Sequence, residues 1–273
     1  MSNSNCSGNC STCGSNCNER KNDSMFEPTG EFNSIKHVIA VVSGKGGVGK
    51  SAVTSMLAVE LCRKGYKVGI LDADITGPSI PKAFGINSPA MQNEMGILPA
   101  ETQSGIKIIS VNMMLGDREQ PVVWRGPVIA GLVKQFWQEV FWGELDFLLI
   151  DCPPGTGDVP LTVFQTIKLD GVIMVTSPQD LVSLIVKKAL NMANMMNVKV
   201  IGIIENMSYV VCPDCGKKFS VFGDSEGKYN DFNIKMLAKL PIDPSLAQMI
   251  DNGAVEHFGG DFLDDAISEI EKL

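Results

Sequence analysis

The chain has 273 residues, and 23 Lys+Arg against 31 Asp+Glu give a formal net charge of −8 at pH 7. At about 150 residues per domain, this length fits one large α/β domain with appendages as well as two domains. The acidic balance disfavours nucleic acid or an anionic membrane as the main partner, because both are bound through clustered Lys and Arg. The sequence has no apolar run long enough for a membrane span and no signal-peptide core, so we expect a cytoplasmic protein with reduced thiols.

Residues 1–24 form a polar tail that cannot fold alone, because 18 of these 24 residues are Ser, Asn, Cys or Gly. Its four cysteines, Cys6, Cys10, Cys13 and Cys17, have the spacing C-x₃-C-x₂-C-x₃-C. Four soft ligands this close together in a reducing compartment indicate a metal site that holds an iron-sulfur cluster or zinc. Residues 25–34 are expected to be a linker, and residues 35–273 the folded domain.

Short apolar runs alternate with helical patterns from residue 37 onward, which predicts a mostly parallel sheet with helices on both faces. We expect strands near 37–43, 67–72, 107–113, 146–151, 171–177, 198–206 and 235–240. Helices are expected near 50–64, 127–141, 159–168, 180–196, 244–252 and 261–272. Ligands of such sheets bind at the carboxyl ends of the strands, so functional residues should follow strands directly.

A phosphate-binding motif follows the first expected strand. It comprises Gly44, Lys45, Gly46, Gly47, Val48, Gly49, Lys50 and Ser51, fits G-x-x-x-x-G-K-[ST], and runs through Ala52 into a helical pattern. Converging backbone N–H groups and the helix N-terminus suit phosphate oxygens. Lys50 is expected to reach the β- and γ-phosphates of ATP, and the Ser51 hydroxyl to ligate Mg²⁺.

Three aspartates lie at the ends of two expected strands, Asp72 and Asp74 after the second strand and Asp151 after a later one. Asp151 is assigned to the Mg²⁺ shell, Asp74 to positioning the attacking water, and Asp72 to supporting them. The alternative for Asp72 or Asp74 is a helix N-cap, a position that Asp favours.

Lys45 adds a second lysine to the motif, which resembles the deviant Walker A of the SIMIBI-class ATPases, including MinD, ParA, the nitrogenase iron protein and the Mrp/ApbC carriers. Later come Asp-Cys-Pro-Pro-Gly-Thr-Gly-Asp at 151–158, Glu-Asn-Met-Ser at 205–208 and Cys-Pro-Asp-Cys at 212–215. The combination resembles the Mrp/ApbC family of iron-sulfur cluster carriers over essentially the whole chain after residue 35. The resemblance implies a homodimer in which Lys45 reaches the partner's nucleotide; the alternative is a solvated loop lysine. It also implies that Asn206 and the segment from Pro241 to Asp243 hold the adenine, although Asn206 alone also suits a turn that ends a strand.

Cys212 and Cys215 can place two thiolates on one metal centre, whereas a 4Fe-4S cluster or a structural zinc takes four ligands. A symmetric dimer would supply all four. With the ATPase context, the resemblance implies an ATP hydrolase, slow without a partner, that binds a 4Fe-4S cluster at this dimer-bridging pair and transfers it to apo-proteins. The alternatives are a zinc-stabilised dimeric ATPase, a spatial-organising ATPase of the MinD or ParA kind, and an ATP-driven electron donor. Cys62 and Cys152 are expected to be small buried residues rather than ligands.

Overall fold

The computed structural model describes residues 26–74, 79–94, 96–114, 126–179, 182–223, 229 and 233–273. The strands are β1 (Ser34–Ser43), β2 (Val68–Asp72), β3 (Met91–Asn93), β4 (Gly96–Leu98), β5 (Ala100–Glu101), β6 (Lys107–Ser110), β7 (Glu144–Asp151), β8 (Gly171–Thr176), β9 (Val200–Val211), β10 (Lys218–Phe219) and β11 (Met236–Pro241). The α-helices are α1 (Lys50–Arg63), α2 (Ser79–Ala83), α3 (Gly126–Glu139), α4 (Asp158–Thr166), α5 (Val182–Met195), α6 (Pro244–Asp251) and α7 (Asp264–Ile270), with 3-10 turns at Val111–Met114 and Val255–His257. No helix among these residues is both long and apolar enough to cross a bilayer.

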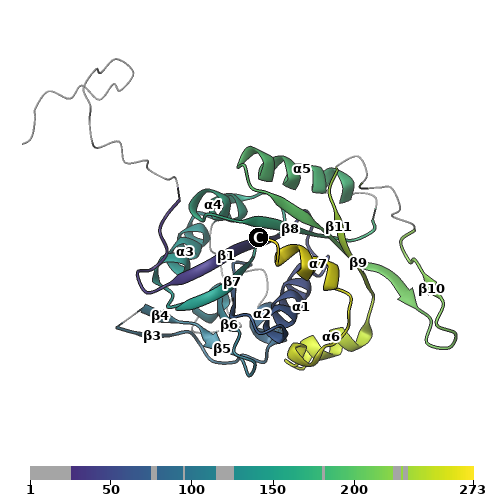
Figure 1. Ribbon diagram of the computed structural model, residues 1–273, viewed down its shortest axis with the longest axis horizontal. Coiled ribbons are helices and arrows are strands. Elements are labelled where there is room, and N and C mark those ends of the chain that lie inside the picture. Colours follow the sequence, from purple (N-terminus) through teal and green to yellow (C-terminus); the bar gives the residue numbers. More distant parts are fainter. Residues whose placement is uncertain are drawn as a thin grey trace, which may run out of the picture.

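Nine strands form one twisted sheet in the order β10-β9-β8-β1-β7-β2-β6-β5, with β11 also paired to β9 (Figure 1). All pairs are parallel except β10 with β9 and β5 with β6. Because β1 lies between β7 and β8, the loops after these three strands emerge side by side at the carboxyl edge of the sheet. The mostly parallel sheet expected from the sequence is therefore confirmed.

The central strands are buried on both faces, which explains their continuous apolar runs. Along β1, Val38, Ala40 and Val42 enter the core beneath α3, α4 and α5, whereas Ile39 and Val41 enter the core beneath α1 and α7. This alternation follows from the two-residue period of a strand. Helices thus cover both faces of the sheet and hold its carboxyl edge in place (Figure 1).

The segment before β1 is bound to α3 and α4. Glu27 N donates to Thr166 O at 2.8 Å, and Trp137 Nε1 donates to Glu27 O at 2.9 Å. The Lys134 ammonium lies 2.6 Å from Glu27 Oε1, and Thr29 Oγ1 donates to Trp137 O at 3.0 Å. Residues 26–33, expected to be a linker, are therefore packed at the amino edge of the sheet, opposite the loops that follow β1 and β7.

The structure departs from the expected elements mainly at β9. The strand expected to end at Asn206 continues to Val211, because its later part pairs with β11 and then with β10. Asn206 is therefore inside a strand, and its interpretation as a strand-ending turn residue is wrong. The very short elements α2, β3, β4, β5 and β10 were not expected either.

Candidate nucleotide site and cysteine hairpin

The loop between β1 and α1 forms a cradle at the carboxyl edge of the sheet. Gly47 and Gly49 have φ values of 78° and 76°, a left-handed backbone that favours glycine. Gly49 is the N-cap of α1, so the free N–H groups of the first helical turn follow the loop directly. A cavity of about 310 Å³ lies here. It is lined by Ser43, Lys45, Gly46, Gly47, Val48, Gly49, Lys50, Ser51, Ala52, Asp74, Ser79, Ala83, Pro154 and Ile250.

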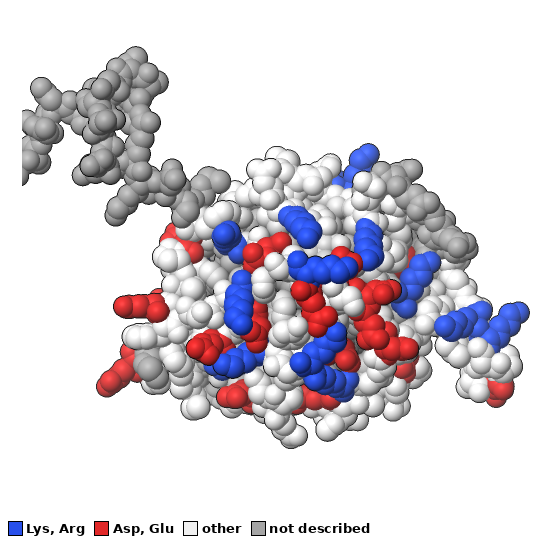
Figure 2. Space-filling model, viewed as in Figure 1, with Lys and Arg blue, Asp and Glu red and all other residues white. Residues whose placement is uncertain are grey.

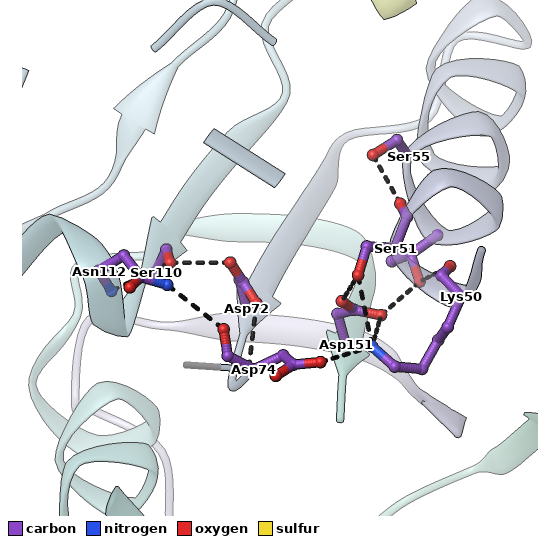
Figure 3. A network of polar contacts seen from close by, with 9 residues as sticks. Lys50, Ser51, Ser55, Asp72, Asp74, Ser110, Asn112 and Asp151 are labelled. Atoms are coloured by element: carbon purple, nitrogen blue, oxygen red, sulfur yellow. Dashed lines mark hydrogen bonds and ion pairs between the residues drawn. The ribbon is translucent and has the colours of Figure 1, made fainter. Parts of the chain in front are cut away.

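Lys50 is the centre of the polar network in this cradle (Figure 3). Its Nζ lies 2.7 Å from Asp151 Oδ1 and 3.6 Å from Asp74 Oδ2, and its side chain is only 5% exposed. Ser51 Oγ donates to Asp151 Oδ2 at 2.6 Å, and Thr54 Oγ1 donates to Asp151 Oδ1 at 2.8 Å. Burial lowers the pKa of the Lys50 ammonium, but the carboxylates of Asp151, Asp74 and Asp72 together outweigh that effect and the pKa is raised. The lysine therefore stays charged in the site.

Asp72 lies behind these groups and is completely buried. Ser110 Oγ donates to its Oδ2 at 2.8 Å, and the backbone N–H of Asp74 donates to its Oδ1 at 3.1 Å (Figure 3). Burial and the nearby Asp151 charge raise the pKa of the Asp72 carboxyl well above its usual range. The described part of α2 begins at Ser79, and residues 75–78 lie outside the described residues, so the N-cap interpretation of Asp72 or Asp74 stays an alternative.

The residues of this cradle suit Mg²⁺ and a nucleoside triphosphate. Ser51 and Asp151 supply adjacent hydroxyl and carboxylate oxygens, the ligand types that Mg²⁺ prefers. The Ser43 hydroxyl at the base of the cavity is buried and has no hydrogen-bond partner among the described residues. The Ser43 hydroxyl and the backbone N–H groups at the start of α1 can thus donate hydrogen bonds to an anionic ligand in the cavity.

Asn206 contacts the same loop from β9. Its Nδ2 donates to Val48 O at 3.0 Å, and its Oδ1 accepts from Met207 N at 2.9 Å. A Cβ on Gly49 would lie 2.3 Å from Asn206 Nδ2, so this contact depends on glycine. The side chain expected to hold adenine therefore lies against the loop and is not among the described residues that line the cavity, so its role at the adenine stays a prediction.

The other two residues expected at the adenine lie farther along the chain. Pro241 ends β11 in register with Tyr209. Asp243 is the N-cap of α6, where its Oδ1 accepts from Ser245 N at 2.8 Å. Neither is among the described residues that line the cavity, whereas Ile250 of α6 is. Their role at the adenine stays a prediction.

The pair of cysteines expected to bind a cluster lies on a hairpin. Strand β9 turns back into β10 through Cys212–Lys217, with Cys212 N donating to Lys217 O at 3.0 Å and Gly216 N to Cys212 O at 2.9 Å. Cys215 is exposed and Cys212 half-buried. The backbone N–H groups of Cys215 and Asp214, followed by the Cys215 side chain, hydrogen-bond to the Cys212 sulfur and lower the pKa of this thiol. The hairpin therefore presents two neighbouring thiols, one of which ionises easily.

A buried network ties the base of this hairpin to the domain. Glu205 is fully buried; its Oε1 accepts from Ser208 Oγ at 2.6 Å and its Oε2 from Tyr229 OH at 2.9 Å. Burial and then the adjacent Glu205 carboxylate raise the pKa of the Tyr229 hydroxyl. Sequence reasoning missed this network, as it missed Thr54 and Ser110 around the aspartates.

The remaining cysteines differ in their surroundings. Cys152 is buried, which raises the pKa of its thiol to about 12, as expected for a core residue. Cys62 is only half-buried, with its Sγ 3.2 Å from Ser104 O. Cys6, Cys10, Cys13 and Cys17 lie outside the described residues. Among the described residues, no three His, Cys, Asp or Glu side chains are grouped so as to hold a metal ion.

Comparison with known proteins identifies the family. Residues 34–271 match the model of the ParA family described as NUBPL iron-transfer P-loop NTPase. The chain belongs to this family of P-loop NTPases. It is 48% identical over 237 residues to an iron-sulfur cluster carrier protein of Clostridium perfringens, covering 83% of each chain. It is also 43% identical to a cytosolic Fe-S cluster assembly factor of Saccharomyces cerevisiae, covering 82% of this chain and 80% of the yeast protein.

Solved structures agree with this membership. A nucleotide-binding protein of Archaeoglobus fulgidus in complex with ADP matches with a TM-score of 0.75 and 44% identity, over 84% of this chain and 90% of that one. The cell division ATPase MinD of Pyrococcus furiosus matches with a TM-score of 0.64 but only 20% identity, over 86% of this chain and 98% of that one. The second likeness shows a shared fold. The expected resemblance to iron-sulfur carriers is confirmed at the level of the family.

Proposed function

We propose that this chain is an ATP-hydrolysing iron-sulfur cluster carrier that works as a homodimer in the cytoplasm. Two copies would hold one cluster between Cys212 and Cys215 of each chain and deliver it to apo-proteins. The observation that carries the proposal is the exposed hairpin, because it offers two thiols and no third ligand among the described residues. Four cysteine ligands are usual for a cluster, and a two-fold axis brings identical pairs together.

Exposed apolar residues on and next to the hairpin support its contact with a second protein chain. Val211, Phe219, Val221 and Phe222 are 39–51% exposed, which makes them four of the ten large exposed apolar residues in the described part of the chain. A hairpin with two residue pairs gains little stability by itself, so apolar surface this concentrated favours contact with another chain. On the face that Figure 2 shows, basic and acidic side chains are interspersed, which gives no support to a nucleic-acid surface there.

The cradle geometry suggests how each group would act on ATP. Lys50 binds phosphate oxygens, and Ser51 and Asp151 exchange their mutual hydrogen bond for contacts to Mg²⁺. The ion would neutralise charge on the phosphates when bound. Asp74, at the rim of the cavity, orients the attacking water, and Lys45 reaches the nucleotide of the partner subunit.

Anaerobic reconstitution tests the proposal. The full-length chain and its Cys212→Ala/Cys215→Ala variant are loaded with iron and sulfide, and cluster transfer to an apo-acceptor is followed by its visible absorption. A Cys62→Ala variant is the matched control. We expect the double variant to lose the transferable cluster and the iron that is bound between two copies of the chain, while the control keeps both. Undiminished transfer by the double variant, or zinc in place of iron in the purified wild type, would contradict the carrier function.

A further inference from the structure

Lys45 contacts a residue of its own chain. Its Nζ donates to Gln179 Oε1 at 2.6 Å. Lys45 comes two residues after the end of β1, and Gln179 three residues after the end of β8, the next strand of the sheet. In register, Ser43 lies opposite Val175, so the two loops leave the sheet side by side. The contact joins the phosphate loop to the neighbouring strand-end loop.

The two partners differ in how freely they can move. Gln179 follows Ser177 and Pro178, which are both buried, so its backbone is fixed by the domain. The Lys45 side chain is exposed and stands on a loop with glycine on both sides. The backbone that carries the Gln179 amide is therefore the more constrained of the two, and the long, exposed side chain of Lys45 is the part that can leave more easily.

The chemistry of the acceptor is suited to release. A neutral amide oxygen accepts a hydrogen bond from an ammonium group without forming an ion pair, so the bond is weaker than one to a carboxylate. Phosphate oxygens carry full charge and attract an ammonium group more strongly than an amide does. A phosphate that comes within reach would thus replace the amide as the acceptor of the lysine.

We propose that Gln179 is a positioning residue that keeps Lys45 against its own subunit until a second copy presents its nucleotide. The inference rests on the proposed role of Lys45 across the dimer. Lys45 must break its hydrogen bond to Gln179 before it can reach the nucleotide of the partner subunit. The strength of this bond therefore affects how readily dimerisation leads to ATP hydrolysis. The bound nucleotide shifts the lysine from one acceptor to the other by its greater affinity for the ammonium.

Two opposite substitutions test this inference in the full chain. Gln179→Ala removes the acceptor, and Gln179→Glu replaces it with a charged one. In the nucleotide-free protein, the labelling rate of the Lys45 amine by a limiting amine-reactive reagent is read by mass spectrometry. We expect labelling to rise roughly fivefold in Gln179→Ala, about the effect of one hydrogen bond, and to fall in Gln179→Glu. The fall should diminish at high salt because charge pairs are screened.

ATP turnover of the same proteins gives the functional readout. We expect Gln179→Ala to exceed the wild type and Gln179→Glu to fall below it, whereas a merely structural role would lower both. Gln165→Glu, the same change at an exposed position of α4, should leave labelling and turnover unchanged. Labelling or turnover that shifts in the same direction in both Gln179 variants, or in neither, would overturn the inference. A Lys45→Ala variant separates the two proposals. If its ATP turnover equals that of the wild type, the proposed role of Lys45 at the partner's nucleotide is wrong, whatever the Gln179 variants show.

Discussion

Replacing Lys50 by alanine should destabilise the nucleotide-free chain by about 3–5 kcal/mol. The Lys50 ammonium lies 2.7 Å from Asp151 Oδ1, and the Asp151 side chain is 0% exposed. Asp72 is also buried and already interacts unfavourably with the Asp151 charge. Truncation removes the cation from this group, so a buried carboxylate loses its partner and cannot recover its hydration. That uncompensated charge, rather than the lost side-chain packing, dominates the expected cost.

The pH dependence of this effect has a definite sign. Because the folded-state pKa of Lys50 is raised, its contribution to stability is fully present below the ordinary lysine value of 10.5 and is lost only as pH rises through the folded pKa. A measurement at pH 8 therefore reports the whole effect. In the variant, Asp72, whose pKa burial and the Asp151 charge already raise, can relieve the repulsion by binding a proton, so the loss of stability should shrink as pH falls toward 5.

Urea denaturation followed by circular dichroism at pH 8 and pH 5 provides the measurement. For a domain of this size, the expected loss corresponds to a melting temperature lower by about 6–20 °C. Lys45→Ala is the matched control, because Lys45 stands in the same loop but is exposed. We expect it to cost no more than about 1 kcal/mol. A loss below about 1 kcal/mol for Lys50→Ala at pH 8, or a loss that grows at pH 5, would refute the reasoning.

Two further predictions concern the loop and the hairpin. Gly49→Ala should cost at least about 2 kcal/mol, because the residue has a φ of 76° and the new Cβ would lie 2.3 Å from Asn206 Nδ2; thermal melting measures this, and a wild-type melting temperature would contradict it. Alkylation of Cys212 should begin at a lower pH than that of an ordinary thiol, because its pKa is lowered and the thiolate is the nucleophile. Cys152, whose thiol pKa is about 12, should stay unlabelled in the folded chain, and mass spectrometry of alkylated peptides distinguishes the two sites.

The sequence was most informative where residues follow buried strands. Lys50, Ser51 and Asp151 were all placed by that rule, and the structure brings their polar atoms within 3.5 Å of one another. Thr54 was missed because it lies within α1, one turn after Lys50, and a threonine in an apolar helix does not stand out in the sequence. Gln179 also follows a buried strand and could have been considered on that ground alone.

The course of β9 could not be read from the sequence. Met207 has a φ of 59°, a rare conformation for a side-chain-bearing residue, and the strand nonetheless continues past it. The continuation depends on pairing with β11, which is distant in the sequence, and with the two-residue strand β10 of the hairpin that follows β9. Elements of two or three residues such as β4 and β10 are too short to show a periodic pattern.

Strand β9 joins the two sites on which the proposed activity depends. Asn206 bonds to the phosphate loop at Val48, and Cys212 follows six residues later, a span of about 20 Å along an extended strand. Ser208 lies between them and donates to the buried Glu205 carboxylate, so the backbone has little freedom to absorb a displacement locally. The described partners of Asp72, Asp151 and Lys50 lie in the cradle rather than on the hairpin. Any influence of the nucleotide on the thiols is therefore most directly transmitted through the Asn206 contact and the backbone that follows it.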